Sequence, residues 1–99
     1  MILVKISEEG KNTFVIVSGH SGVATKGKDI LCAAVSALAQ GAVIGLQNVL
    51  KKKTIIKKSD GYLYFEVAKN AETDILIETF KEAIKDLARQ YPKHLKMEE

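Results

Sequence analysis

Residues 19–36 read GHSGVATKGKDILCAAVS, and this stretch decides how the rest of the chain is expected to fold. It contains the only cysteine of the chain, Cys32, and one of its two histidines, His20. Glycines punctuate its polar half, which predicts a loop, whereas its apolar and alanine-rich half predicts the start of a helix. We therefore expect a strand that ends at His20, then a loop, then a helix whose first turn presents Cys32.

The helix is expected to begin after Asp29 and to continue from Ile30 to about Leu50. Asp29 fits the N-cap, because its carboxylate can accept hydrogen bonds from the first backbone N–H groups of the helix. Apolar side chains cover most of the surface of this helix, which predicts burial on more than one side. One side can pack on a sheet, and the other needs either the second helix or another subunit, with small residues that allow close approach. We predict a homodimer on this basis; the small residues are Ala34, Ala37, Gly41 and Gly45.

The remaining segments predict two hairpins and a second helix. Alternating apolar residues predict strands over 2–7, 13–18, 54–58 and 62–67. Asp60-Gly61 is a strong signal for a tight turn between the last two strands. Asn70 can cap a final helix from about Ala71 to Tyr91, which Pro92 would stop. Its expected apolar stripe comprises Ile75, Leu76, Phe80, Ala83, Ile84, Leu87 and Tyr91.

These elements predict a single α+β domain over residues 1–99, with the order ββαββα. We expect a two-layer sandwich in which a four-stranded antiparallel sheet carries both helices on one face. Residues 93–99 are expected to form a frayed tail that contributes no strand, and His94 within it is expected to be solvated.

Composition narrows the classes of function. A single cysteine cannot form an internal disulfide, which is typical of a reducing compartment and favours the cytoplasm. The uncharged run 30–46 is short for a membrane span and contains polar residues and glycines, so a buried helix is expected and no membrane association. One cysteine and two distant histidines predict no metal site, and no cofactor is expected because the phosphate-binding glycine motifs are absent.

Cys32 and His20 are the residues best suited to chemistry. Near a helix N-terminus, backbone N–H groups and the helix dipole favour a thiolate, and an imidazole can act as the base that forms it. Backbone N–H groups at the helix start or in the turn 19–22 could stabilise an oxyanion. The residues alone leave other interpretations open: Cys32 as a small buried apolar side chain, and His20 as a histidine satisfied by nearby backbone. Asp29 could orient the imidazole as well as cap the helix.

Two other functions remain open from the residues. The lysines at positions 51–53, 57 and 58 lie near Tyr62 and Tyr64, as they would in a non-catalytic module that binds RNA or a ribosome. Solvated lysines that protect a sheet edge explain the same pattern. A purely structural dimerisation domain with an inert Cys32 is the third possibility.

The combination of Gly19-His20 with the segment Asp29-Ile30-Leu31-Cys32-Ala33-Ala34-Val35-Ser36 resembles the bacterial ribosomal-processing cysteine proteases, the Prp family. The resemblance extends over the whole chain and implies a cytoplasmic, dimeric Cys-His endopeptidase. It implies that the substrate is the N-terminal segment of a ribosomal protein precursor, large-subunit protein number twenty-seven, from which the family removes an N-terminal extension. Nucleic acid is expected as a partner only through the ribosome.

The resemblance also implies a set of site residues. The catalytic pair would be His20 and Cys32, and the supporting residues would be Gly19, Asp29 and Ser36. The loop between His20 and Cys32 would move over the substrate, and its residues of interest are Ser21, Gly22, Gly27 and Lys28.

Overall fold

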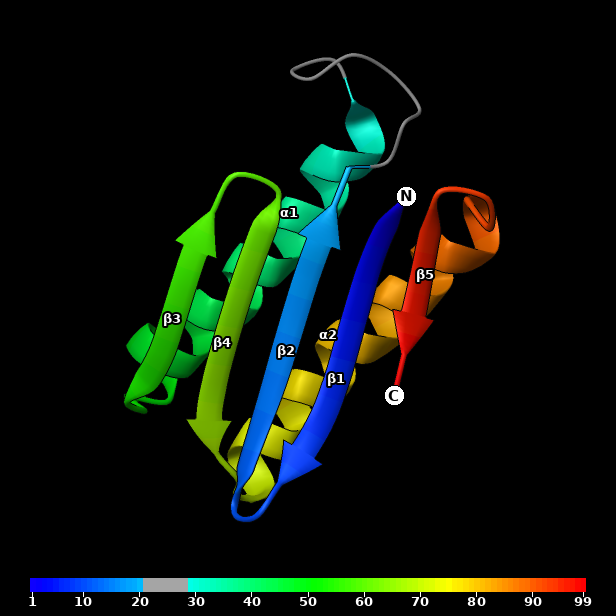
Figure 1. The fold of residues 1–99 in the computed structure, drawn as a ribbon. Helices are drawn as coiled ribbons and strands as arrows, with labels where there is room; N and C mark the ends of the chain where they lie inside the picture. Colours follow the sequence, from blue (N-terminus) through cyan, green and yellow to red (C-terminus); the bar gives the residue numbers. More distant parts are fainter. Residues whose placement is uncertain (21–28) are drawn as a thin grey trace.

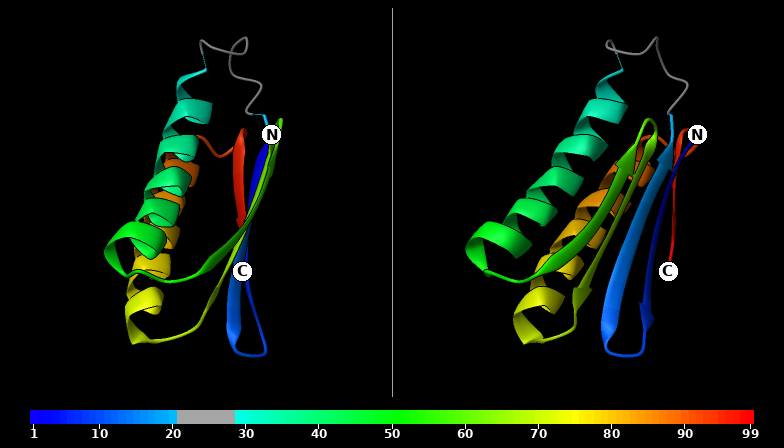
Figure 2. Two further views of the ribbon diagram at one scale, coloured as in Figure 1. Left: turned by 90° about the vertical axis from the view of Figure 1, so that its left-hand side faces the viewer. Right: turned by 60° about the vertical axis from the view of Figure 1, so that its left-hand side comes forward.

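The computed structural model describes residues 1–20 and 29–99, which form a sheet with two helices packed on one of its faces (Figure 1). Figure 2 shows the two layers edge-on, with both helices on the same side of the sheet. In chain order the elements are β1 (Ile2–Glu9), β2 (Asn12–Gly19), α1 (Ile30–Ile44), the π-helical turn η1 (Gly45–Val49), β3 (Thr54–Ser59), β4 (Tyr62–Ala68), α2 (Ala71–Gln90) and β5 (Leu95–Glu98).

The sheet has five strands in the order β3-β4-β2-β1-β5 in the described part of the chain. The predicted hairpins are confirmed, since β1 pairs antiparallel with β2 and β3 with β4. The prediction of a purely antiparallel, four-stranded sheet is wrong, because β5 adds a fifth strand parallel to β1. The expected frayed tail is therefore an ordered edge of the sheet.

The reason for the fifth strand lies in its alternating side chains. Leu95 pairs with Ile2 in the strand register and is only 2% exposed, and Met97 pairs with Val4. Both therefore extend the apolar face on which the helices pack. The His94 carbonyl also accepts a hydrogen bond from the Ile2 N–H (2.8 Å). Without β5 this edge of β1 would lack its backbone partner, which carries a cost for buried groups.

The core lies between the helices and one face of the sheet. Phe65 of β4 is fully buried and meets the ring of Phe80 of α2 edge-on, with 6.3 Å between the ring centroids. The buried face of α2 consists of Thr73, Ile77, Phe80 and Ile84, at steps of four, three and four residues. The predicted stripe wrongly included Ile75, which is 69% exposed, because the helix is rotated so that Ile77 faces the sheet instead.

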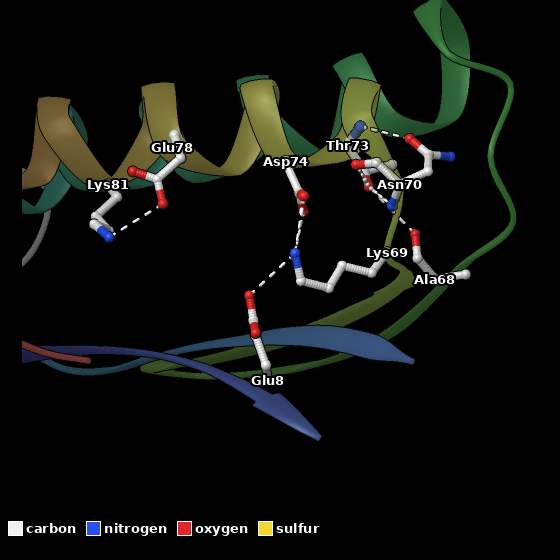
Figure 3. Close-up of polar contacts among 8 residues, drawn as sticks. All are labelled: Glu8, Ala68, Lys69, Asn70, Thr73, Asp74, Glu78 and Lys81. Carbon is white, nitrogen blue, oxygen red and sulfur yellow. Dashed lines mark hydrogen bonds and ion pairs between the residues drawn. The ribbon is translucent and has the colours of Figure 1, made fainter. Parts of the chain in front are cut away.

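The start of α2 is fixed by a polar network that Figure 3 shows. The Asn70 side chain accepts a hydrogen bond from the Thr73 N–H, and the Thr73 hydroxyl accepts one from the Asn70 N–H, which forms a capping box. The predicted N-cap is thus confirmed. Beside it, the Lys69 ammonium group bridges Glu8 of β1 (3.2 Å) and Asp74 of α2 (2.8 Å). This network connects the end of the sheet to the first turn of α2.

Helix α1 has one covered face and one open face. Its side chains Leu31, Val35, Ala39 and Ala42 are buried against the rest of the domain. Ile30 and Ile44 of α1, and Val49 of η1, are 78%, 53% and 73% exposed. Packing against α2 thus meets part of the expected burial on a second side, and these three apolar side chains remain exposed within one chain. By length and composition, Ile30–Val49 is also long and apolar enough to cross a membrane.

One predicted close approach along this helix is made to the second helix, which was one of the two expected partners. A Cβ added at Gly45 would lie 2.8 Å from a methyl carbon of Leu76, so Gly45 lets α2 of the same chain approach. Gly41 has open space where its Cβ would be, and it stays available to a second copy.

Candidate active site

Three segments meet at the end of the sheet where β2 ends (Figure 1). They are the end of β2 with His20, the first turns of α1 with Cys32, and the turn between β3 and β4. Together they line a cleft of about 530 Å³. The wall formed by α1 consists of Cys32, Val35, Ser36, Ala39 and Gln40, and the opposite wall consists of residues 58–63.

Cys32 lies in the first turn of α1 and is half-buried at the wall of the cleft. The Asp29 carboxylate oxygen Oδ1 accepts a hydrogen bond from the Cys32 N–H (3.0 Å), so the predicted N-cap is confirmed. This cap fixes where α1 begins, and it therefore fixes the position of the thiol relative to the sheet.

The charge of Asp29 acts directly on this thiol. The pKa of the Asp29 carboxyl lies below its ordinary value, first because of the hydrogen bond from the Cys32 N–H. Hydrogen bonds from the Cys32 thiol and the Leu31 N–H, and the positive charge of His94, lower it further, whereas burial opposes the shift. Asp29 is thus anionic at neutral pH. Its negative charge lies at the N-terminal end of α1, where the helix dipole stabilises an anion.

The N-cap also engages the backbone N–H groups at the helix start, which were predicted as candidates to stabilise an oxyanion. The N–H groups of Leu31 and Cys32 hydrogen-bond to the Asp29 carboxylate, and the Ala33 N–H donates to the Asp29 carbonyl (3.1 Å). These three donors at the helix start are therefore already engaged. The other group of candidate donors, the turn 19–22, lies partly outside the described residues.

His20 follows directly after β2 and is exposed on the opposite side of the cleft from α1. Gly19 before it has a φ of +90°, and a Cβ at Gly19 would lie 2.3 Å from the Met1 carbonyl oxygen. A side chain at position 19 would be strained by both its backbone angle and this contact. Gly19 therefore allows the chain to turn His20 toward the cleft.

The structure places the other predicted site residues in different ways. Ser36 lines the cleft one turn after Cys32, and Gly19 lines it beside His20. The loop residues Ser21, Gly22, Gly27 and Lys28 lie outside the described residues. His94 differs from its prediction: it is half-buried and its charge acts on Asp29. The reason is that β5 holds this segment against β1.

The sequence interpretation missed the second wall of the cleft. Asp60 and Gly61 were identified as a hairpin turn but not as part of a site. The antiparallel pairing of β2 with β4, in which Ser18 faces Tyr62, brings this turn next to His20. The pairing of two strands that are distant in sequence could not be read from either strand alone. Gln40 and Ala39 were missed too, although their spacing from Cys32 places them along one face of α1.

The lysine-rich hairpin forms a separate surface. Lys57 belongs to the edge strand β3, and its ammonium group lies 5.3 Å from the centre of the Tyr64 ring on β4. The Tyr64 hydroxyl donates a hydrogen bond to Glu66, which raises the pKa of Tyr64 to about 12 and lowers that of Glu66. A carboxylate at the centre of this cluster would repel phosphate groups. RNA binding by this hairpin stays a prediction without a specific contact to support it.

Comparison with known proteins identifies the family. Residues 1–96 match the family described as cysteine protease Prp. The chain belongs to this family. A curated relative, the ribosomal processing cysteine protease Prp of Staphylococcus aureus strain Mu50, is 24% identical over 98 residues, which cover 95% of this chain and 92% of the relative.

Solved structures of Prp proteins have the same fold. The S. aureus protease in complex with a covalently linked product peptide superposes with a TM-score of 0.89 at 27% identity, over 99% of this chain and 98% of that chain. The same protease in complex with a substrate peptide superposes with a TM-score of 0.75 at 25% identity, over 98% of this chain and 97% of that chain. Both are described as an essential ribosomal processing protease.

Proposed function

We propose that this protein is a cysteine endopeptidase that removes the N-terminal extension of a large-subunit ribosomal protein precursor, with Cys32 as nucleophile and His20 as base and acid. The observation that carries the proposal is that the only cysteine and a histidine from a different element line one cleft. The Prp relatives support it, since they are named as ribosomal processing proteases and one holds a covalently linked product peptide.

The reaction follows from these two side chains. His20 removes the proton of the Cys32 thiol, and the sulfur attacks the carbonyl carbon of the scissile peptide bond. When the tetrahedral intermediate collapses, the C–N bond breaks and His20 gives its proton to the departing amine. A water molecule, deprotonated by His20, then attacks the thioester, which releases the carboxylate product and regenerates the thiol.

Asp29 and the walls of the cleft have supporting roles in this proposal. Asp29 fixes the start of α1, because its carboxylate accepts the hydrogen bond from the Cys32 N–H. Cys32 and Gln40 are eight residues apart on α1, which corresponds to about 12 Å along the helix axis. An extended peptide advances about 3.3 Å per residue, so three or four substrate residues can lie between α1 and the β3–β4 turn.

The direct test is incubation of the protein with the extended precursor and with the precursor lacking its extension, followed by mass spectrometry of the products. We expect one cut in the extended precursor, which creates a new N-terminus, and no cut in the shortened protein. The proposal is rejected if the folded protein leaves the extended precursor intact when the two are mixed at equal concentrations.

We also propose that the protein acts in the cytoplasm as a homodimer that buries the open face of α1. The support is an exposed apolar stripe at steps of three, four, four and three residues, a spacing suited to packing against a second helix. This stripe comprises Ile30, Ala33, Ala37, Gly41 and Ile44. Because Ile30 and Ile44 are more than half exposed in one chain, a second copy gives them an apolar environment.

Replacing Ile44 with glutamate should separate the dimer, because association would then bury a carboxylate in an apolar contact. Light scattering coupled to size-exclusion chromatography should give twice the mass of one chain for the wild type and one chain mass for Ile44→Glu. The control Thr79→Glu adds the same charge to the exposed surface of α2 and should stay dimeric. A monomeric wild type at all accessible concentrations would contradict the proposal.

A further inference from the structure

The imidazole of His20 lies directly against the backbone of Gly61 in the β3–β4 turn. A Cβ added at Gly61 would lie 2.9 Å from His20 Nε2, 3.4 Å from Cε1 and 3.6 Å from Cδ2. The first of these separations is shorter than real side-chain contacts allow, so either the ring or the turn would have to shift. The absence of a side chain at position 61 thus leaves the space that the ring occupies.

The same turn also holds the backbone that carries His20. The Gly61 carbonyl accepts a hydrogen bond from the Gly19 N–H (2.8 Å), immediately after the last strand pair between Ser18 and Tyr62. On its other side, Gly19 faces the Met1 carbonyl so closely that no Cβ fits. The backbone before His20 is therefore enclosed by two other chain segments, one of which also contacts the ring.

We propose that Gly61 is a positioning residue that seats the His20 imidazole at the cleft, so that the ring can exchange a proton with Cys32. This inference rests on the proposed function of His20. Gly61 acts through His20 and takes no part in bond making or breaking. Because the ring is the far end of a side chain and Gly61 is part of a paired turn, a side chain at position 61 would move the ring rather than the turn, and the loss of activity follows from this displacement.

A simpler role for Gly61 would be to supply the backbone angle of the turn, since its φ is +66°. The chain contains a matched control for this alternative. Gly10 is the first residue of the two-residue β1–β2 turn, whereas Gly61 is the second residue of the β3–β4 turn, but both have a positive φ: that of Gly10 is +61°, and a Cβ there would have nothing within 4 Å. Alanine therefore meets a positive φ at both positions, but only at position 61 does it also meet the imidazole. Asparagine tolerates this backbone region better, yet its Cβ would still meet the ring.

The experiment compares Gly61→Ala and Gly61→Asn with Gly10→Ala and Gly10→Asn. Two readouts are measured in each variant: the rate at which iodoacetamide alkylates Cys32, and the NMR signals of ¹³C-labelled histidine. Only two histidines are present, so a His94→Gln spectrum assigns both signals. We expect both Gly61 variants to lose at least tenfold in alkylation rate and to shift the His20 signals. Both Gly10 variants should stay within twofold of the wild type, with His20 unshifted.

A further measurement needs only the wild-type protein: we expect a nuclear Overhauser effect between the His20 ring protons and the Gly61 α-protons. The inference is overturned if this effect is absent, or if the Gly61 and Gly10 variants alkylate at the same rate with His20 unshifted. Failure of the proposed function has a different signature. In that case His20→Gln would be alkylated at the same rate as the wild type, although the wild type shows the NMR contact between His20 and Gly61.

Discussion

Replacing Cys32 with alanine is expected to lower the rate of precursor cleavage by at least about 10³-fold, because no other side chain can form the thioester. Cys32 is half-buried between the cleft and the edge of the core, and alanine removes only its sulfur, so the fold should remain intact. Thermal unfolding of Cys32→Ala should therefore stay close to that of the wild type, while mass spectrometry detects no new N-terminus.

A second variant separates chemistry from packing. Cys32→Ser keeps a small polar side chain at the start of α1 but replaces the thiol with a much weaker nucleophile. It should be as inactive as Cys32→Ala and equally stable. If Cys32→Ser or Cys32→Ala still cut the precursor at the wild-type rate, the nucleophile would have to be another group and the proposed mechanism would fail.

Replacing His20 with glutamine is expected to have the second-largest effect, a loss of about 10²- to 10⁴-fold in cleavage, which is the usual contribution of a general acid and base. Glutamine retains hydrogen-bonding capacity but cannot accept the thiol proton. Alkylation of Cys32 should slow in the same variant, because the thiolate would lose its imidazolium partner. The measurement is a time course of iodoacetamide modification followed by intact-mass spectrometry.

The matched control is His94→Gln, which removes the other histidine of the chain. The His94 carbonyl accepts a hydrogen bond from Ile2 and the His94 N–H donates one to the Tyr91 carbonyl, and the substitution leaves both backbone bonds in place. We expect cleavage and alkylation within about threefold of the wild type, because His94 does not line the cleft and acts on the site only through its weak charge effect on Asp29. Equal losses in His20→Gln and His94→Gln would show that His20 has no special role.

Local patterns in the sequence predicted the elements of this fold because each signal acts over a few residues. Asn70 caps α2 and Asp29 caps α1, as their side chains and positions indicated. Asp60-Gly61 forms the expected hairpin turn. The rotation of α2 was predicted less well: both Ile75 and Ile77 are apolar, and only contact with the sheet determines which of them is buried.

Features that depend on distant pairing could not be predicted in the same way. Strand β5 is only four residues long, and its pairing with β1 requires α2 to return the chain to the far edge of the sheet. The pair His20 and Cys32 was proposed from residue chemistry, whereas the contact of His20 with Gly61 depends on the register between β2 and β4. The engagement of the Cys32 N–H by Asp29 followed from the cap itself. Whether the helix start can stabilise an oxyanion depends also on the Leu31 and Ala33 N–H groups, which Asp29 engages as well.

The position of Met1 has a practical consequence for handling this protein. The Met1 carbonyl lies against Gly19, and Ile2 lines the cleft, so an affinity tag fused ahead of Met1 would start beside this cleft. The turn at Gly10 lies at the opposite end of the sheet, with open space around it (Figure 1). A label or surface attachment placed there would leave the cleft accessible, which makes this turn the preferred point for immobilising the enzyme.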